Sequence, residues 1–136
     1  MFLDDDVVFF KNAFFEMNKI IQKYFNDTKI VGFGFNQIQR TGNDFFEKFK
    51  TSKFISKVKL YSDQPGYVTK GGWNTKILNL KKDIFADWVF TTASIFKSHA
   101  IKNRFFDLSF GSYSYLEDLD FSLNLTKSKK KIIRSE

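Results

Sequence analysis

Two short stretches of the chain gather carboxylates at spacings that could serve catalysis. Residues 4–6 are three consecutive aspartates, and Glu117, Asp118 and Asp120 fall within four residues near the other end. Carboxylates can hold a divalent cation against phosphate oxygens. A carboxylate can also take the proton from an attacking hydroxyl group. Metal binding and general-base catalysis are therefore the chemistry that these residue types offer.

The second stretch falls where a helix is expected to begin. Ser114 followed three residues later by Glu117 is a capping-box pattern, which predicts a helix start at this point. Three leucines at helical spacing supply a buried stripe: Leu116, Leu119 and Leu123. Asp118 then lies about 100° round the helix from Glu117 and could face an open cleft. The alternative is that the carboxylates only cap the helix and favour the positive end of its dipole.

The aspartates at 4–6 follow an apolar pair that we interpret as the end of a strand. Ligands of open α/β sheets bind beyond the carboxyl ends of strands. Apolar residues three and four apart predict a helix over 11–25, and residues 29–35 read as a strand. This order of strand, helix and strand suits a parallel crossover unit. An acidic helix N-terminus is the alternative, but three consecutive aspartates exceed what one cap requires.

The rest of the chain gives a less regular pattern. In order, we expect a short helix at 44–49, a strand at 58–61, a turn at 63–66, a returning strand at 67–69, a tight turn at 70–74, a strand at 84–90 and a helix at 95–102. His99 is the single histidine. It has no histidine partner at metal-binding spacing, so a structural or exposed position is expected for it.

Taken in order, these segments resemble glycosyltransferase family 2, a large group of GT-A enzymes that use nucleotide sugars. The aspartates at 4–6 resemble its DxD segment. Residues 86–90 and 93–97 resemble its strand and the helix entry that follows. Residues 105–107 and then 113–120 look like its acceptor-side segment, "FDE … GED-D". The order and approximate spacing match over nearly the whole chain.

The resemblance implies an inverting, metal-dependent transfer of a sugar from a nucleotide-sugar donor to a cell-surface polysaccharide or glycolipid acceptor. Asp6 would ligate Mn²⁺ or Mg²⁺, Asp4 would contact the metal or the ribose, and Asp5 would lie at the donor. Asp118 matches the position of the family's base. Glu117 would orient the site or the acceptor.

The resemblance also has departures and gaps. No arginine follows the Glu-Asp segment, and the processive signature is absent, so a non-processive enzyme is the better match. Trp73, Trp88 and Asp120 are candidates for acceptor contact. The expected fold is α/β, a partial Rossmann-like GT-A fold with a mixed sheet and flanking helices, in one domain over 1–136. Its nucleoside-binding half would be missing, which predicts an exposed sheet edge, self-association and little activity alone.

Composition limits the other classes of function. The chain has 136 residues, a formal charge of +7, nineteen phenylalanines and no cysteine, so disulfides and thiolate metal sites are excluded. Part of the charge lies in a basic tail at 126–136. No apolar run is long enough to span a bilayer, and we expect a cytoplasmic protein, with peripheral contact at the inner membrane face left open. A non-catalytic remnant or basic binding module is the main alternative, and a nucleic-acid-binding protein is disfavoured.

Overall fold

A computed structural model of the protein describes residues 1–36, 62, 64–75, 80–103, 106–111, 116–127 and 130–134. Within these ranges the elements, in chain order, are β1 (Phe2–Leu3), α1 (Ala13–Tyr24), β2 (Ile30–Gly34), β3 (Ile84–Ala86), β4 (Ala93–Phe96), α4 (Ser98–Ile101), the 3-10 helix η1 (Leu108–Phe110), α5 (Glu117–Thr126) and β5 (Lys131–Arg134).

The five strands form one mixed sheet in the order β1-β4-β2-β5-β3. β2 and β5 are parallel, and the other three neighbouring pairs are antiparallel. One edge of the sheet therefore gathers the carboxyl ends of β1, β2 and β5 with the first residues of β3 and β4. We call this the carboxyl edge, and its strand residues are Leu3, Gly34, Arg134, Ile84 and Ala93.

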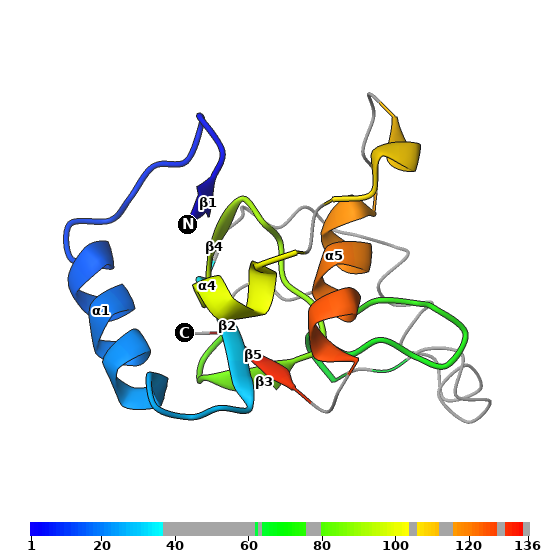
Figure 1. Cartoon of the computed structure of the whole chain (residues 1–136). Helices are drawn as coiled ribbons and strands as arrows, with labels where there is room; N and C mark the ends of the chain where they lie inside the picture. The colour runs from blue at the N-terminus through cyan, green and yellow to red at the C-terminus, as the bar shows by residue number, and fades with distance from the viewer. Residues whose placement is uncertain are drawn as a thin grey trace.

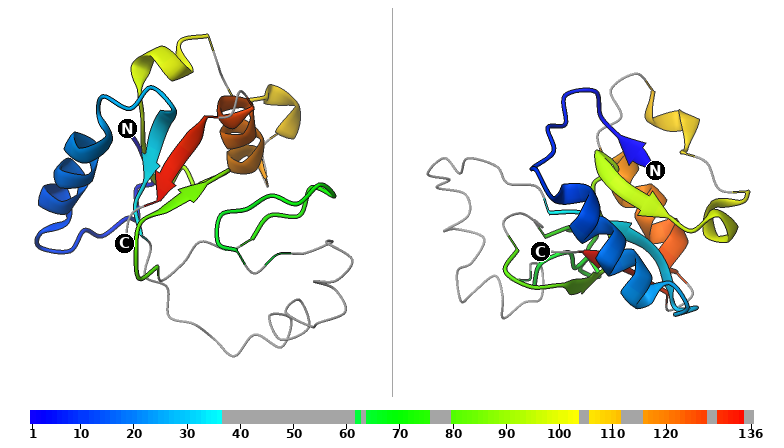
Figure 2. Two further views of the ribbon diagram at one scale, coloured as in Figure 1. Left: turned by 90° about the horizontal axis from the view of Figure 1, so that it is seen from below. Right: turned by 90° about the vertical axis from the view of Figure 1, so that its left-hand side faces the viewer.

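A helix covers each face of the sheet, so the described part of the chain has three layers (Figures 1 and 2). On one face, Met17 of α1 packs with Phe33, Phe35 and Ile133. The other face carries the larger core; its members from α5 are Leu119, Phe121 and Leu125, and from the sheet Val31, Ala86, Phe96 and Ile132. Ile132 and Ile133, neighbours on β5, thus serve opposite layers, as alternation along a strand requires. Val31 and Phe33 of β2 also serve opposite layers although they are two residues apart, because the pairing of β2 with β5 shifts register between Ile30 and Gly32.

Two predicted elements are confirmed. α1 occupies Ala13–Tyr24, inside the predicted span, and Met17, Ile21 and Tyr24 of its apolar stripe pack toward the sheet, whereas Phe14 is exposed. β2 occupies Ile30–Gly34 and is buried along its whole length. β1 and β2 run in the same direction, but β4 lies between them and pairs with both in antiparallel fashion. The predicted crossover unit therefore joins strands that are not direct neighbours.

The helix predicted at 95–102 is wrong over its first part. Ala93–Phe96 is strand β4, and a helix of only four residues follows it at Ser98–Ile101. Ile95 and Phe96 pair with Phe33 and Gly32 of β2. Such residues suit a buried strand, and this non-local pairing outweighs the helical spacing in the sequence. The strand predicted at 84–90 is also shorter, ending at Ala86.

The basic tail predicted at 126–136 is wrong as well. Thr126 ends α5, and Lys131–Arg134 is β5, which lies between β2 and β3 in the sheet. Ile132, Ile133 and Arg134 are fully covered. The many lysines of this region made it read as polar in the sequence, although Ile132 and Ile133 pack into the two opposite layers of the core.

The turn predicted at 70–74 is confirmed. Gly72 has a φ of 83°, which glycine adopts without strain, and an isolated bridge joins Val68 to Asn74 across the turn. At 67–69 the chain makes only this bridge rather than a regular strand. The elements predicted at 44–49 and 58–61 lie outside the described residues.

Candidate active site

The first acidic stretch lies at the carboxyl edge of the sheet. β1 pairs with β4 so that Leu3 faces Ala93, and the backbone N–H of Asp4 donates to the carbonyl of Thr92 at 3.2 Å. Asp4, Asp5 and Asp6 are all exposed. The sheet therefore fixes the backbone of Asp4 and leaves the three carboxylates in solvent just beyond the strand.

Asp118 reaches the same place from α5. Its carboxylate accepts a hydrogen bond from the hydroxyl of Thr91, the residue before the one that holds Asp4. Two adjacent threonines thus hold Asp118 and Asp4 at the start of β4. Figure 1 shows the beginning of α5 and the loop after β1 at the same end of the molecule. The structure brings together two acidic groups that are 114 positions apart in the sequence.

Burial raises the pKa of the Asp118 carboxyl above its ordinary value. The hydrogen bond from Thr91 opposes this shift, and the nearby negative charges of Glu117 and Asp4 add to it. A partly desolvated carboxylate with a raised pKa is a stronger base than an ordinary aspartate.

The helix start differs from the prediction. α5 begins at Glu117, and its N-cap residue is Leu116 rather than Ser114, which lies outside the described residues. Leu116 has a φ of 74° and makes no side-chain capping bond. This left-handed conformation is uncommon for a residue with a bulky side chain. Glu117, Asp118 and Asp120 therefore occupy the first turn, where the helix dipole favours negative charge.

Two contacts fasten α5 to the segment that precedes β4. The buried hydroxyl of Ser122 accepts from the Val89 N–H at 3.2 Å and lies 3.3 Å from the Val89 carbonyl. At the end of the helix, the Thr126 hydroxyl donates to the carbonyl of Asp87 at 3.2 Å. These bonds set the position of the helix relative to Thr91, and so the position of Asp118.

Sequence reasoning missed the structural role of Asp87 and the donor role of Thr91. The Asp87 carboxylate forms an ion pair with Lys131 at the start of β5, and its second oxygen accepts from the Val68 N–H at 3.2 Å. Asp87 thus joins the turn at 64–75, β5 and the end of α5. The only available signal was a single aspartate beside a predicted strand, which does not reveal partners 19 and 44 residues away.

The three acceptor candidates lie in different surroundings. Trp88 is 3% exposed and belongs to the core, and its indole N–H donates to the Thr75 carbonyl at 3.1 Å. Trp73 is 57% exposed, and Asp87 connects the base of its turn, at Val68, to Thr126 at the end of α5 opposite Asp118. Asp120 accepts from the Asn124 side chain at 2.9 Å, one turn along the helix. The structure therefore does not bring the two tryptophans to the carboxyl edge.

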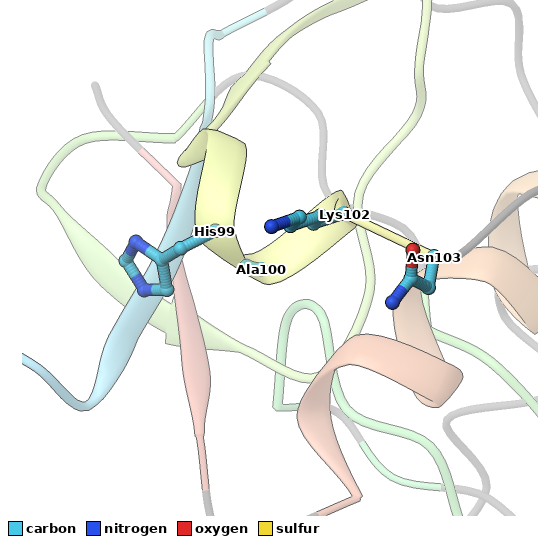
Figure 3. Close-up of a pocket in the computed structure, with 4 residues that line it drawn as sticks. All are labelled: His99, Ala100, Lys102 and Asn103. Atoms are coloured by element: carbon cyan, nitrogen blue, oxygen red, sulfur yellow. The ribbon is translucent and has the colours of Figure 1, made fainter.

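A hollow of about 410 Å³ lies elsewhere, at α4. Its lining residues are His99, Ala100, Lys102 and Asn103 (Figure 3). Because α4 follows the end of β4 and Thr91 precedes its beginning, the hollow and the acidic residues are at opposite ends of that strand. His99 is exposed, as the sequence predicted. The hollow does not belong to the acidic site.

The acidic stretch suits a metal of the magnesium class. Within the described ranges, no three histidine, cysteine, aspartate or glutamate side chains converge on one point as a ready-made metal site. Mg²⁺ is commonly held by one or two carboxylates together with substrate phosphates and water. The exposed carboxylates of Asp4 and Asp6 fit that role, because their remaining ligands would come with the substrate.

Comparisons with family models, with curated proteins and with solved structures find no match to the chain. None of the helices in the described ranges is both long and apolar enough to cross a membrane.

Proposed function

We propose that the chain carries the metal-binding and base residues of an inverting glycosyltransferase that uses a nucleotide-sugar donor. One observation carries the proposal: the adjacent residues Thr91 and Thr92 bind the carboxylate of Asp118 and the backbone N–H of Asp4 at the carboxyl edge of the sheet. The raised pKa of Asp118 supports a proton-accepting role for it. The ordered sequence resemblance to glycosyltransferase family 2 supplies the reaction and the acceptor class, a cell-surface polysaccharide or glycolipid.

In the proposed reaction the acceptor hydroxyl attacks the anomeric carbon of the donor sugar. A new carbon–oxygen bond forms as the bond from that carbon to the diphosphate breaks, and the nucleoside diphosphate leaves. Asp118 takes the hydroxyl proton late in this step, when the attacking oxygen has become acidic enough for a carboxylate to remove its proton. A single displacement of this kind inverts the configuration of the anomeric carbon.

Asp4 and Asp6 would hold the divalent cation, with Asp5 beside the donor. When bound, the cation neutralises negative charge that develops on the diphosphate. The hydroxyl and the backbone N–H of Thr91 keep the Asp118 carboxylate oriented through hydrogen bonds. Glu117 lies at the first position of the same helix and raises the pKa of Asp118 through its charge.

Calorimetry tests the proposal directly. We expect Mn²⁺ to strengthen binding of at least one of UDP, GDP and dTDP to the protein, and Asp6→Asn to remove most of that strengthening, since an amide is a poorer ligand for a hard cation. Glu16→Gln is the matched control, because it removes an exposed carboxylate on α1. Equal metal dependence in the wild type and Asp6→Asn would rule out the metal assignment. Absence of any metal-dependent binding would favour a non-catalytic module.

A further inference from the structure

Arg134, the last residue of β5, is a buried cation without a visible partner. Its side chain is 0% exposed, and its three nitrogen atoms receive no hydrogen-bond acceptor from the residues that the structure describes. A guanidinium carries five N–H donors, and leaving such groups dry and unpaired is costly. Burial lowers the pKa of Arg134 to about 10. Among the described residues, the arginine therefore has no anion of the kind that normally accompanies a buried charge.

The sheet is built to accommodate this side chain. Residues paired across all five strands form one row at the carboxyl edge: Phe2, Ser94, Gly34, Arg134 and Ile84. Arg134 lies directly beside a glycine. A Cβ atom at Gly34 would be 3.2 Å from the Arg134 Cδ and 2.6 Å from a Val89 methyl carbon. The absence of a side chain at Gly34 thus leaves the space that the arginine stem occupies.

Arg134 ends its strand at the same edge as the acidic site. Ser94, two strands away in the row, is on β4 three residues after Thr91. At about 4.8 Å between neighbouring strands, the backbones of Arg134 and Ser94 are about 10 Å apart. Asp4, Asp5 and Asp6 give this edge an excess of negative charge, which would repel an anionic ligand. A cation at the same edge offsets that repulsion.

We propose that Arg134 is an anion-binding residue that takes a phosphate group of the diphosphate-bearing donor. A guanidinium matches phosphate oxygens through paired hydrogen bonds, which suits this ligand chemistry. The inference rests on the proposed function for the identity of the donor. Binding includes an outward swing of the side chain from Gly34, because no part of Arg134 is exposed in this structure.

The test uses inorganic pyrophosphate with the whole chain in EDTA, so that the metal assigned to Asp4 and Asp6 cannot contribute. We expect calorimetry to detect pyrophosphate binding to the wild type, and binding at least about tenfold weaker to Arg134→Met, as expected when a charged hydrogen-bonding group is lost. Lys102→Met removes one positive charge at α4 and should bind like the wild type.

Thermal melting without ligand supplies the second readout. Replacing an unpaired buried charge by an apolar group of similar size should leave the protein as stable as the wild type or more so. Equal pyrophosphate binding by wild type and Arg134→Met would overturn the proposal. An equal loss of pyrophosphate binding in Lys102→Met would also overturn it, because it would indicate general charge attraction. An Arg134→Met protein that melts much lower or fails to fold would overturn it too, because it would place the arginine's partner within the protein. If pyrophosphate binds without metal and Mn²⁺ does not strengthen nucleoside-diphosphate binding, the role of Arg134 would stand and only the metal assignment of Asp4 and Asp6 would be contradicted.

Discussion

The carboxyl group of Asp118 experiences opposing influences. Its burial on α5 disfavours the charged form, and the neighbouring charges of Glu117 and Asp4 act in the same direction. The hydroxyl of Thr91 stabilises the charged form through a hydrogen bond. Because the first influence is the largest, the pKa of Asp118 lies above its ordinary value. The residue is thus less stable as an anion than an exposed aspartate, and a better proton acceptor.

This raised pKa predicts how Asp118 affects stability. The folded protein binds the Asp118 proton more tightly than the unfolded chain, whose carboxyl has the ordinary pKa of 3.8. The stabilising contribution is therefore complete below that pKa and is lost as the pH rises through the higher folded value. Asp118→Asn stays neutral and can still accept from Thr91. We expect it to be more stable than the wild type at pH 7 by about 0.5–2 kcal/mol, in the range of other stabilising substitutions.

Urea unfolding at pH 7 and below pH 3.8 checks this prediction, and the difference should vanish at the lower pH. Asp107→Asn is the control, because the pKa of Asp107 is lowered by hydrogen bonds from Ser109. Its stabilising contribution exists above the ordinary pKa and disappears as the pH falls, so Asp107→Asn should lose stability at pH 7. A loss of stability at pH 7 in Asp118→Asn would contradict the account of Asp118.

At the scale of elements, the position of Asp118 depends on how α5 is fastened. The Ser122 hydroxyl, one helical turn after Asp118, bonds to both backbone groups of Val89. Val89 in turn lies two residues before Thr91. This bond therefore couples the helix to the segment that supplies the threonine donor, and the capping pattern in the sequence contains no sign of it.

Ser122→Ala should destabilise the protein, because it leaves the buried N–H of Val89 without its acceptor. The expected loss is about 1–3 kcal/mol in the free energy of unfolding. Ser98→Ala, at the exposed first position of α4, is the matched control and should change little. Chemical denaturation of the three proteins provides the measurement. Equal stability of Ser122→Ala and the wild type would show that the bond does not hold α5.

The close contact between β2 and β4 gives a second prediction at this scale. A Cβ atom at Gly32 would be 2.4 Å from a Phe96 ring carbon and 3.1 Å from the Ile95 carbonyl oxygen. Gly32→Ala should therefore destabilise the sheet by about 1–3 kcal/mol, as overpacked cores do. At Gly71 the nearest atom would be 3.7 Å away, an ordinary contact, so Gly71→Ala is the control. A Gly32→Ala protein that melts with the wild type would contradict the described pairing.

The spacing of apolar residues in the sequence predicted the two elements whose residues follow a clear local pattern, α1 and β2. Apolar residues at helical spacing gave α1, and a continuous apolar run gave β2. β4 was mistaken for a helix because Ile95 and Phe96 become a strand only through pairing with β2. β5 was hidden by its flanking lysines. The candidate carboxylates could be found from their types, but the Thr91–Asp118 bond joins residues 27 positions apart, and burial of Arg134 depends on Gly34 a hundred positions away.

In the whole molecule, the sheet brings segments that are far apart in the sequence to one edge, the carboxyl edge. The loop after β1, the threonines before β4 and the start of α5 meet there, and β5 ends there with Arg134. Part of the net charge of +7 lies at 126–136, whereas the exposed Asp4, Asp5 and Asp6 follow one another at this edge. A divalent cation and Arg134 are the two positive partners that the proposed function places against a diphosphate.

The most direct test of Asp118 as the base compares two proteins, the wild type and Asp118→Asn. The measurement is the release of nucleoside diphosphate from a panel of UDP-, GDP- and dTDP-sugars in Mn²⁺. Glu16→Gln, which removes an exposed carboxylate on α1, is the control. The account predicts that Asp118→Asn still binds nucleoside diphosphate and melts no lower at pH 7, while release slows by roughly 10²–10⁴, the usual loss with a general base. Release by Asp118→Asn at the wild-type rate would contradict it.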